Sequence, residues 1–270
     1  MTGEGTGTGG SQELLVRCEG GVLRLTMNRP GALNAVTDTL SDALAAEIED
    51  AVTRDDVRVV LLDGAGGAFC AGADIVPGAD GADAADRLDH RALDRANRVT
   101  RAILACGAPV VAAVDGVAAG VGCSMALACD LVVASPRSRF LLAFARIGLM
   151  PDGGATALVA ASVGRARAMR MALLAEPLDA TAAFEAGLVS HLSGEDDHAE
   201  VVAEVVARLA AGPPLALTAT RRAVNAAALT ALEDALERER TGQSVLLRTE
   251  DATEGMRAFG ERRPAVFRGC

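Results

Sequence analysis

The chain has 270 residues, half of them apolar, and a formal net charge of −10. This length and composition allow one large domain with a sizeable core and argue against disorder over most of the chain. The net negative charge argues against nucleic acid as a partner, because binding a phosphate backbone requires a net basic face.

Strands and helices alternate over the first two-thirds of the sequence. Apolar patterns predict two strands around the turn Glu19-Gly20-Gly21, a helix over 37–54 capped by Thr37, and a buried strand over 57–64. A Gly-rich loop follows this strand, and the small, acidic stretch 78–90 leads into a helix over 91–104. Further segments are a strand over 109–116, a short buried helix over 122–130 and a strand over 131–135.

The second half of the chain is mostly helical by pattern. Helices are expected over 153–163 and 165–174, and the segment 178–192 predicts a helix closed by Gly187 and then a short strand. Gly212-Pro213-Pro214 breaks the chain, and three helical stretches follow, over 215–228, 230–248 and 250–259. We therefore expect an α/β protein with a flexible tail at 1–12, a core over 13–211 and a helical C-terminal region over 212–270.

Neither a metal site nor a membrane span is expected. The six cysteines show no CxxC or metal-ligand spacing, so reduced thiols are predicted. The apolar stretch 109–134 is bracketed by Asp115 and Asp130 and interrupted by glycines, which favours a buried strand, turn and helix over a membrane segment. The N-terminus lacks the basic start and apolar run of a signal peptide. We expect a cytoplasmic protein.

Two Gly/Ala-rich segments, 66–75 and 115–130, each follow an apolar strand. Small residues allow the backbone to approach a ligand closely, and a helix beginning near Gly122 would point free N–H groups at an anion. Two such donors converging on one oxygen form an oxyanion hole, whereas the alternative is tight packing alone. The sequence contains no GxxxxGK[ST], its Gly116, Gly120 and Gly122 do not fit GxGxxG, and "GCSMA" misses GxSxG.

Four ordered motifs carry a more specific resemblance: "LTMNRPGALNAV", "AFCAGADI", "VAAVDGVAAGVGCSMALACDLVVAS" and "FARIGLMPDGGAT". Together with "AFGERRPAVF", they resemble the enoyl-CoA hydratase/isomerase (crotonase) superfamily from about residue 13 to the end. The resemblance implies a spiral core of ββα units, a C-terminal helical region used in trimerisation, and a homotrimer or hexamer. It also implies an acyl-CoA thioester substrate and no separate cofactor, because coenzyme A is part of the substrate.

The resemblance assigns the two oxyanion donors to the backbone N–H groups of Ala73 and of Val121, which follows Gly120. The family usually has Gly where this chain has Val121, whose side chain would narrow the pocket. The same resemblance places Ala32, Leu33 and Ala71 along the coenzyme A path. It also suggests that Arg262 or Arg263 reaches the coenzyme A phosphates, with a solvated basic tail as the alternative.

Hydratases of this family typically use two glutamates, and both are missing here. Ser124 and Phe144 occupy the matching positions and cannot transfer protons as carboxylates do. Isomerisation needs only one base, and "MPDGGAT" places Asp152 where isomerase branches resembling Δ3,Δ2-enoyl-CoA and 1,2-epoxyphenylacetyl-CoA isomerases keep a single acid. We therefore favour an isomerase. The alternatives are a hydratase with a non-standard acid and a silent acyl-CoA-binding homologue.

Asp152 also has a purely structural interpretation, as N-cap of the helix predicted over 153–163. The helix dipole would lower the pKa of its carboxyl, whereas apolar burial would raise it, and the sequence leaves this sign open. Asp74 is expected to order the oxyanion turn. Asp80, Asp83 and Asp86 lie in a predicted loop that either covers the acyl chain or is a solvated stretch.

Overall fold

The computed structural model describes residues 13–75 and 90–270. Its main sheet has the strand order β1-β2-β3-β4-β6-β9. The first two strands form the predicted antiparallel hairpin, and the strands from β2 onward are parallel. The bounds of these strands are β1 Leu14–Glu19, β2 Val22–Met27, β3 Val59–Gly64, β4 Val110–Val114, β6 Leu131–Ala134 and β9 His191–Leu192.

Helices cover both faces of this sheet, so its central strands are buried and nearly continuously apolar. Successive side chains of β3 point to opposite faces. Val60 and Leu62 join the main core with α1 (Asp38–Asp50) and α3 (His90–Ala105), whereas Val59 and Leu61 pack toward α7 (His198–Ala210). The hydroxyl of Thr37 accepts from Leu40 N–H at 3.1 Å, which confirms the predicted cap of α1.

A small second sheet stands beside the main one, in the order β5 (Val117–Ala119), β7 (Arg139–Leu141) and β8 (Leu178–Asp179). No sequence pattern predicts these strands, because two or three residues are too short to show a periodicity. Directly after β5, the chain forms α4 (Val121–Ala128), in which every residue is buried. The stretch 109–134 therefore folds as strands, a turn and a buried helix, as predicted.

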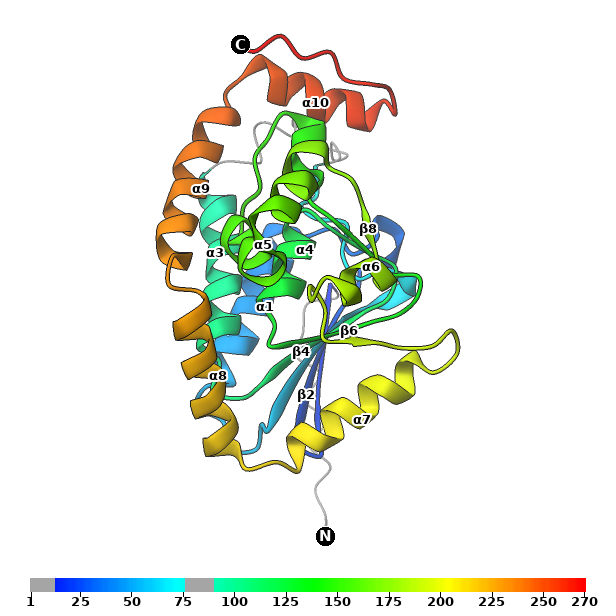
Figure 1. Cartoon of the computed structure of the whole chain (residues 1–270), viewed down its shortest axis with the longest axis vertical. Helices are drawn as coiled ribbons and strands as arrows, with labels where there is room; N and C mark the ends of the chain where they lie inside the picture. The colour runs from blue at the N-terminus through cyan, green and yellow to red at the C-terminus, as the bar shows by residue number, and fades with distance from the viewer. Residues whose placement is uncertain (1–12, 76–89) are drawn as a thin grey trace.

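The last part of the chain is helical and packs back onto the core. Figure 1 shows α8 and α9 along one side of the molecule, and α9 packs against α3 and α5. Inside α5, Gly164 has φ 74° and ψ 161°, which are not helical values. This kink lies at the boundary between the two helices predicted over 153–163 and 165–174. The bounds are α5 Ala155–Leu174, α6 Ala180–Glu185, α8 Pro214–Ala228, α9 Leu232–Leu246 and α10 Glu250–Gly260, with short 3-10 turns η1 Pro30–Ala32, η2 Ala65–Gly67 and η3 Ala143–Ile147.

Within the described ranges, no helix is long and apolar enough to cross a membrane by itself. The pair α7 and α8 reaches that length and composition only when taken together, and the two helices are bent by 107° at their junction.

Candidate active site

The first Gly-rich turn is attached to the small sheet by backbone hydrogen bonds. Phe69 and Cys70 N–H donate to Val117 O at 3.1 and 2.9 Å, and Ala119 N–H donates to Cys70 O at 2.8 Å. The turn then reverses at Gly72, whose φ of +103° strongly favours glycine. This attachment fixes the position of Ala73, the residue that follows the reversal.

The N–H of Ala73 has no acceptor among the described residues. The bridge between Val36 and Ala73 uses other groups: Val36 N–H donates to Gly72 O at 2.7 Å, and Asp74 N–H donates to Val36 O at 3.0 Å. The carboxylate of Asp74 binds the guanidinium of Arg29 at 2.8 Å. This ion pair connects the turn to Arg29, and Ala73 N–H is left available as a donor.

The second turn ends at Gly120, which has φ 52° and ψ −130° and precedes the first residue of α4. The hydrogen bonds of α4 begin where Cys123 and Ser124 N–H donate to Gly120 O at 3.0 and 3.2 Å. The N–H of Val121 lies before this first bond, and it has no acceptor among the residues that the structure describes, as is usual for the first N–H groups of a helix. It is the second N–H group that the sequence predicts for the oxyanion hole.

The two turns lie against each other at their glycines. A Cβ atom added to Gly72 would lie 3.0 Å from Ala119 O and 3.6 Å from the Cα of Gly120. The ring of Phe144 lies beside Gly120: a Cβ atom added to Gly120 would be 3.9 Å from Cζ of Phe144. The structure therefore brings Ala73 and Val121 to one place, each one residue beyond these touching glycines.

The loop that carries Asp152 lies against the start of α4. The hydroxyl of Ser124 donates to the backbone carbonyl of Asp152 at 2.7 Å. A Cβ on the next residue, Gly153, would lie 3.4 Å from Cγ2 of Val121 and 3.1 Å from Cβ of Ser124. The Val121 side chain thus lies between the turn that ends at Gly120 and the Asp152 loop.

The carboxyl group of Asp152 is buried and only half satisfied. Its Oδ2 accepts a hydrogen bond from Gln243 Nε2 at 2.9 Å, whereas Oδ1 has no hydrogen-bond partner within residues 13–75 and 90–270. Burial raises the pKa of Asp152 to about 7; the bond from Gln243 lowers it, and the nearby charge of Glu239 raises it. The direction of the pKa shift, which the sequence leaves open, is therefore upward, and burial is its main cause.

The helix-capping interpretation of Asp152 is wrong, because another carboxylate caps α5. Glu239, on α9, accepts from Gly154 N–H at 2.7 Å and from both the N–H and the hydroxyl of Thr156. The helix itself begins after Gly154 without a cap from its own flanking side chain. No local sequence signal identifies Glu239 and Gln243, because both lie on a helix more than 80 residues beyond the motif that they contact.

The residues predicted along the coenzyme A path also come together. Ala71 N–H donates to Leu33 O at 2.9 Å, and Leu33, with φ 49°, is half exposed at the end of η1, next to Ala32. The buried amide of Asn34 holds this corner, because its Nδ2 donates to Ala65 O and Ala68 O. Asn34 is not among the residues predicted from the sequence.

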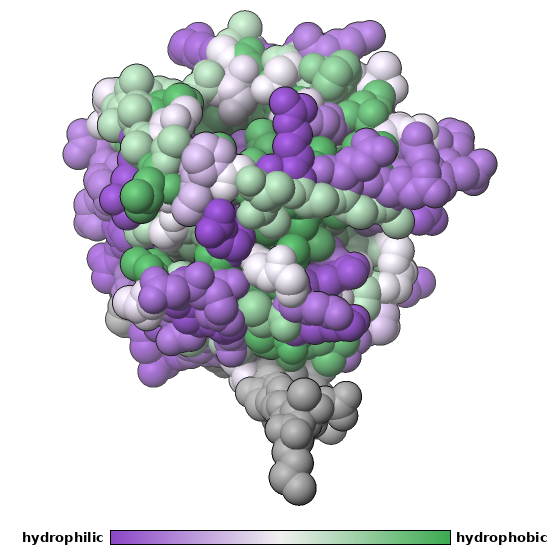
Figure 2. All heavy atoms as spheres, turned by 90° about the horizontal axis from the view of Figure 1, so that it is seen from below, coloured by the Kyte–Doolittle hydropathy of each residue, from purple (hydrophilic) through white to green (hydrophobic). Residues whose placement is uncertain are grey.

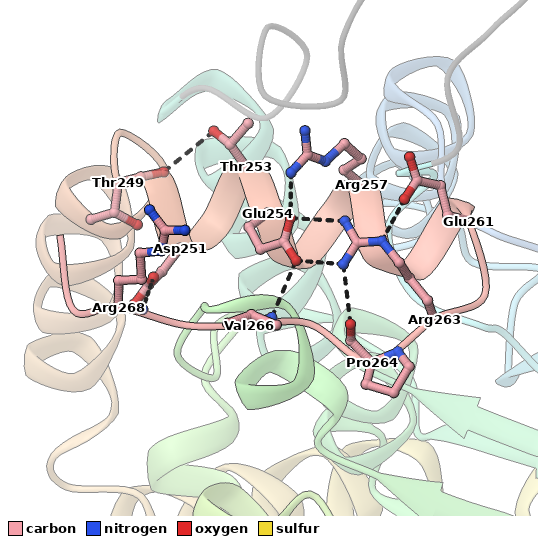
Figure 3. A network of polar contacts seen from close by, with 10 residues as sticks. All are labelled: Thr249, Asp251, Thr253, Glu254, Arg257, Glu261, Arg263, Pro264, Val266 and Arg268. Atoms are coloured by element: carbon pink, nitrogen blue, oxygen red, sulfur yellow. Dashed lines mark hydrogen bonds and ion pairs between the residues drawn. The ribbon is translucent and has the colours of Figure 1, made fainter.

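The two predicted arginines near the C-terminus differ in their surroundings. Figure 3 shows Arg263 inside a polar network in which its guanidinium binds Glu254 and Glu261. Glu254 also accepts from Arg257 and from Val266 N–H, so these contacts hold the C-terminal segment along α10. Arg262 is exposed, and its side chain makes no hydrogen bond or ion pair with the described residues. Of the two guanidinium groups, that of Arg262 is the one without a carboxylate partner among the described residues.

A cavity of about 810 Å³ lies elsewhere, between α7 and strands β2 to β4. Its lining includes Val22, Leu61, Ala113 and Val202 and none of the residues predicted for the site. Figure 2 shows the lower face of the molecule, where hydrophobic residues are visible among hydrophilic ones.

In the ranges 13–75 and 90–270, no group of three His, Cys, Asp or Glu side chains is arranged to hold a metal ion. The predicted Asp80, Asp83 and Asp86 lie outside the described residues.

Comparisons with known proteins show the family to which the chain belongs. The family described as Enoyl-CoA hydratase/isomerase matches residues 17–269. The 1,2-epoxyphenylacetyl-CoA isomerase of Escherichia coli (strain K12) is 36% identical over 95% of this chain and 98% of its own. The 2,3-dehydroadipyl-CoA hydratase of the same organism is 37% identical over 95% of this chain and 99% of its own.

Solved structures give the same result. The crystal structure of an enoyl-CoA hydratase from Mycobacterium avium subsp. paratuberculosis K-10 is similar with a TM-score of 0.88 and 47% identity, and the match covers 95% of this chain and 98% of that one. The chain therefore belongs to the enoyl-CoA hydratase/isomerase (crotonase) family and is an α/β enzyme of that family.

Proposed function

We propose that this chain is an acyl-CoA isomerase that moves a double bond, or opens a ring, in an enoyl-CoA-type thioester, with Asp152 as its single acid and base. One observation carries the proposal. Asp152 is a buried carboxyl group with a pKa of about 7, and one of its oxygens has no hydrogen-bond partner in the described part of the chain. A buried polar atom left unpaired is unfavourable for folding, and such atoms are found where catalysis needs them.

In the proposed reaction, the thioester oxygen accepts hydrogen bonds from the N–H groups of Ala73 and Val121. These two donors stabilise the negative charge that develops on this oxygen as the C2 proton leaves. Asp152 takes the proton from C2 and returns it to C4, so the double bond moves and the carboxylate is regenerated. A pKa near neutrality suits a group that must both accept and donate a proton.

Hydration would require a second group to position and activate water. The hydroxyl of Ser124 donates a hydrogen bond to the backbone carbonyl of Asp152, and the ring of Phe144 lies near Gly120. Neither side chain therefore replaces a carboxylate. Glu239 is the other buried carboxylate beside the loop, but its two oxygens already accept hydrogen bonds from Gly154 and Thr156. The names of the relatives include both reactions, and it is this set of side chains that favours isomerisation.

We further propose that the substrate is an acyl-CoA thioester, with Arg262 near its phosphates, and that copies of the chain assemble as a homotrimer or hexamer. Exposed apolar side chains in the C-terminal region support the assembly. Leu215 is 85% exposed, Val266 is 65% exposed and Phe259 is 56% exposed, and side chains of this kind are commonly covered at subunit contacts.

Three assays of the purified enzyme test the proposed reaction: double-bond migration in a 3-enoyl-CoA, water addition to crotonyl-CoA, and equilibrium binding of acyl-CoA. Migration that is much faster than hydration, and that is lost in Asp152→Asn, supports the proposal. Hydration at rates near migration would replace it with a hydratase. Tight binding without turnover of either substrate would indicate a silent homologue.

A further inference from the structure

We infer that Gln243 is a positioning residue for this reaction, which holds Oδ2 of Asp152 and thereby leaves Oδ1 as the oxygen that moves the proton. The inference rests on the proposed function and deepens it, because it assigns different tasks to the two oxygens of one carboxyl group.

The amide of Gln243 can have only one orientation in this structure. Its Oε1 accepts from Met150 N–H at 3.0 Å, and its Nε2 donates to Met150 O at 2.8 Å. An amide turned over would place donor against donor and acceptor against acceptor. The Met150 backbone therefore fixes which atom of Gln243 faces Asp152, and that atom is a donor.

The two N–H groups of Nε2 are both used, one by Met150 O and the other by Asp152 Oδ2 at 2.9 Å. The terminal torsion of an aspartate is soft, so its two oxygens would otherwise exchange places readily. With Oδ2 bonded to Gln243, this rotation is restrained. The backbone of Asp152 is restrained as well, because Ser124 donates to its carbonyl at 2.7 Å.

The neighbouring elements explain why Oδ1 stays unpaired. From α3, the Thr100 hydroxyl binds Gly153 O at 2.8 Å, and from α9, the Glu239 carboxylate binds Gly154 N–H. These contacts involve the backbone of the two residues after Asp152 and offer no donor to its second oxygen. Oδ1 is buried and has no partner among the described residues, so a substrate C–H proton would meet no competing donor there.

The charges near Asp152 give the inference a pH signature. Glu239 on α9 is the charged group that acts on the Asp152 carboxyl within the described part of the chain, and it raises the pKa, whereas the Gln243 amide lowers it. Removing the amide therefore raises the pKa of Asp152, and more alkaline conditions are needed to ionise it. A residue that merely fills space in the core would not produce this shift.

The test compares Gln243→Met and Gln243→Leu with Ser244→Ala, a control on the same helix whose hydroxyl binds only Arg240 O, one turn back. For the Gln243 variants we expect kcat to fall roughly 100-fold, as for a misplaced catalytic group. We also expect KM to change little and the pH profile of kcat/KM to move to higher pH. Ser244→Ala should match the wild type. A wild-type kcat and pH profile in Gln243→Met would overturn the inference.

A second measurement uses the unaltered enzyme, so it decides even if the Gln243 variants do not fold. A crystal structure with a saturated acyl-CoA should show Oδ1 nearer than Oδ2 to C2 of the acyl chain, with the Gln243 bond intact. Oδ2 as the nearer oxygen would overturn the inference. The proposed function fails separately: an active Asp152→Asn refutes it, whereas an inactive Asp152→Asn with a normal Gln243→Met refutes only the role of Gln243.

Discussion

Glu239 and Asp152 are both buried carboxyl groups beside the start of α5, and Glu239 is the one that binds its first turn. Glu239 accepts from Gly154 N–H at 2.7 Å and from Thr156 N–H at 2.8 Å, although it lies on another helix. In most helices such an acceptor is supplied by the residue that begins the helix. Because α9 supplies it here, Asp152 can stay unbonded at Oδ1.

Replacing Glu239 by Gln should weaken the fold and alter catalysis in a definable direction. The amide would present N–H groups to N–H donors, and we expect a loss of about 1–3 kcal/mol in the free energy of unfolding. Removing the negative charge also lowers the pKa of Asp152, because Glu239 raises it in the wild type. Denaturant unfolding and a pH–rate profile check the two effects. A profile that moves to higher pH would contradict this account.

The buried Asp152 should itself lower stability at neutral pH. Its pKa rises from 3.8 to about 7 on folding, so between these values the folded state holds the proton more tightly than the unfolded state. Stability attributable to this group therefore falls as pH rises through that window and is level above it. Asp152→Asn lacks this loss and should be more stable at about pH 8, by at most about 4 kcal/mol.

Paired unfolding curves of the wild type and Asp152→Asn measure this difference at two pH values. We expect the advantage of the variant to shrink by more than half at about pH 5, where the folded wild type already carries the proton. An advantage that stays constant with pH would show that the pKa of Asp152 is not raised in the folded protein.

The glycine contact beneath the proposed oxyanion hole gives a third prediction. Gly72→Ala would bring a methyl group to 3.0 Å from Ala119 O, so the two turns would have to separate. Loss of one oxyanion donor lowers kcat by about 100-fold or more in other enzymes, and we expect a fall of that order here. The matched control is Gly67→Ala, which has a φ of +78° but open space around the added Cβ. Equal losses in both variants would indicate backbone strain alone.

Replacing Arg262 should change substrate binding, whereas replacing Arg263 should change the stability of the C-terminal segment. Arg262→Ala is expected to raise KM about fivefold for a coenzyme A thioester, as for one exposed ion pair, but not for the matching pantetheine thioester, which lacks the nucleotide phosphates. Arg263→Ala removes the contacts to Glu254 and Glu261 and should make the C-terminal segment more sensitive to proteolysis. If Arg263→Ala alone raises KM for the coenzyme A thioester, the assignment to Arg262 is wrong.

Much of the fold could be predicted because its strands and helices carry local patterns. The hairpin around Gly20-Gly21, the cap at Thr37 and the break before Pro214 all depend on neighbouring residues, and all appear in the structure. Strands β5, β7 and β8 were missed because their short pairing depends on distant partners. Helix α7 was not predicted, although its apolar residues Val202 and Val206 are spaced for one face.

In the candidate site, too, the features that depend on neighbouring residues could be predicted, and the features that depend on distant residues could not. Gly72, Gly120 and Asp152 lie in short motifs, so the sequence could identify the two turns and the candidate acid. It could not show that Asp152 is buried or that Gln243 and Glu239 surround it, because these contacts join residues more than 80 positions apart. For the same reason the direction of the Asp152 pKa shift required the three-dimensional arrangement.

The most direct test of the central claim is the rate of double-bond migration in Asp152→Asn, measured on a 3-enoyl-CoA together with the affinity for acyl-CoA. The amide keeps the shape of the side chain and can still accept from Gln243, but it cannot carry a proton between C2 and C4. We predict a fall in kcat of about 1,000-fold with acyl-CoA binding preserved. Migration within about tenfold of the wild-type rate would contradict Asp152 as the acid and base of this enzyme.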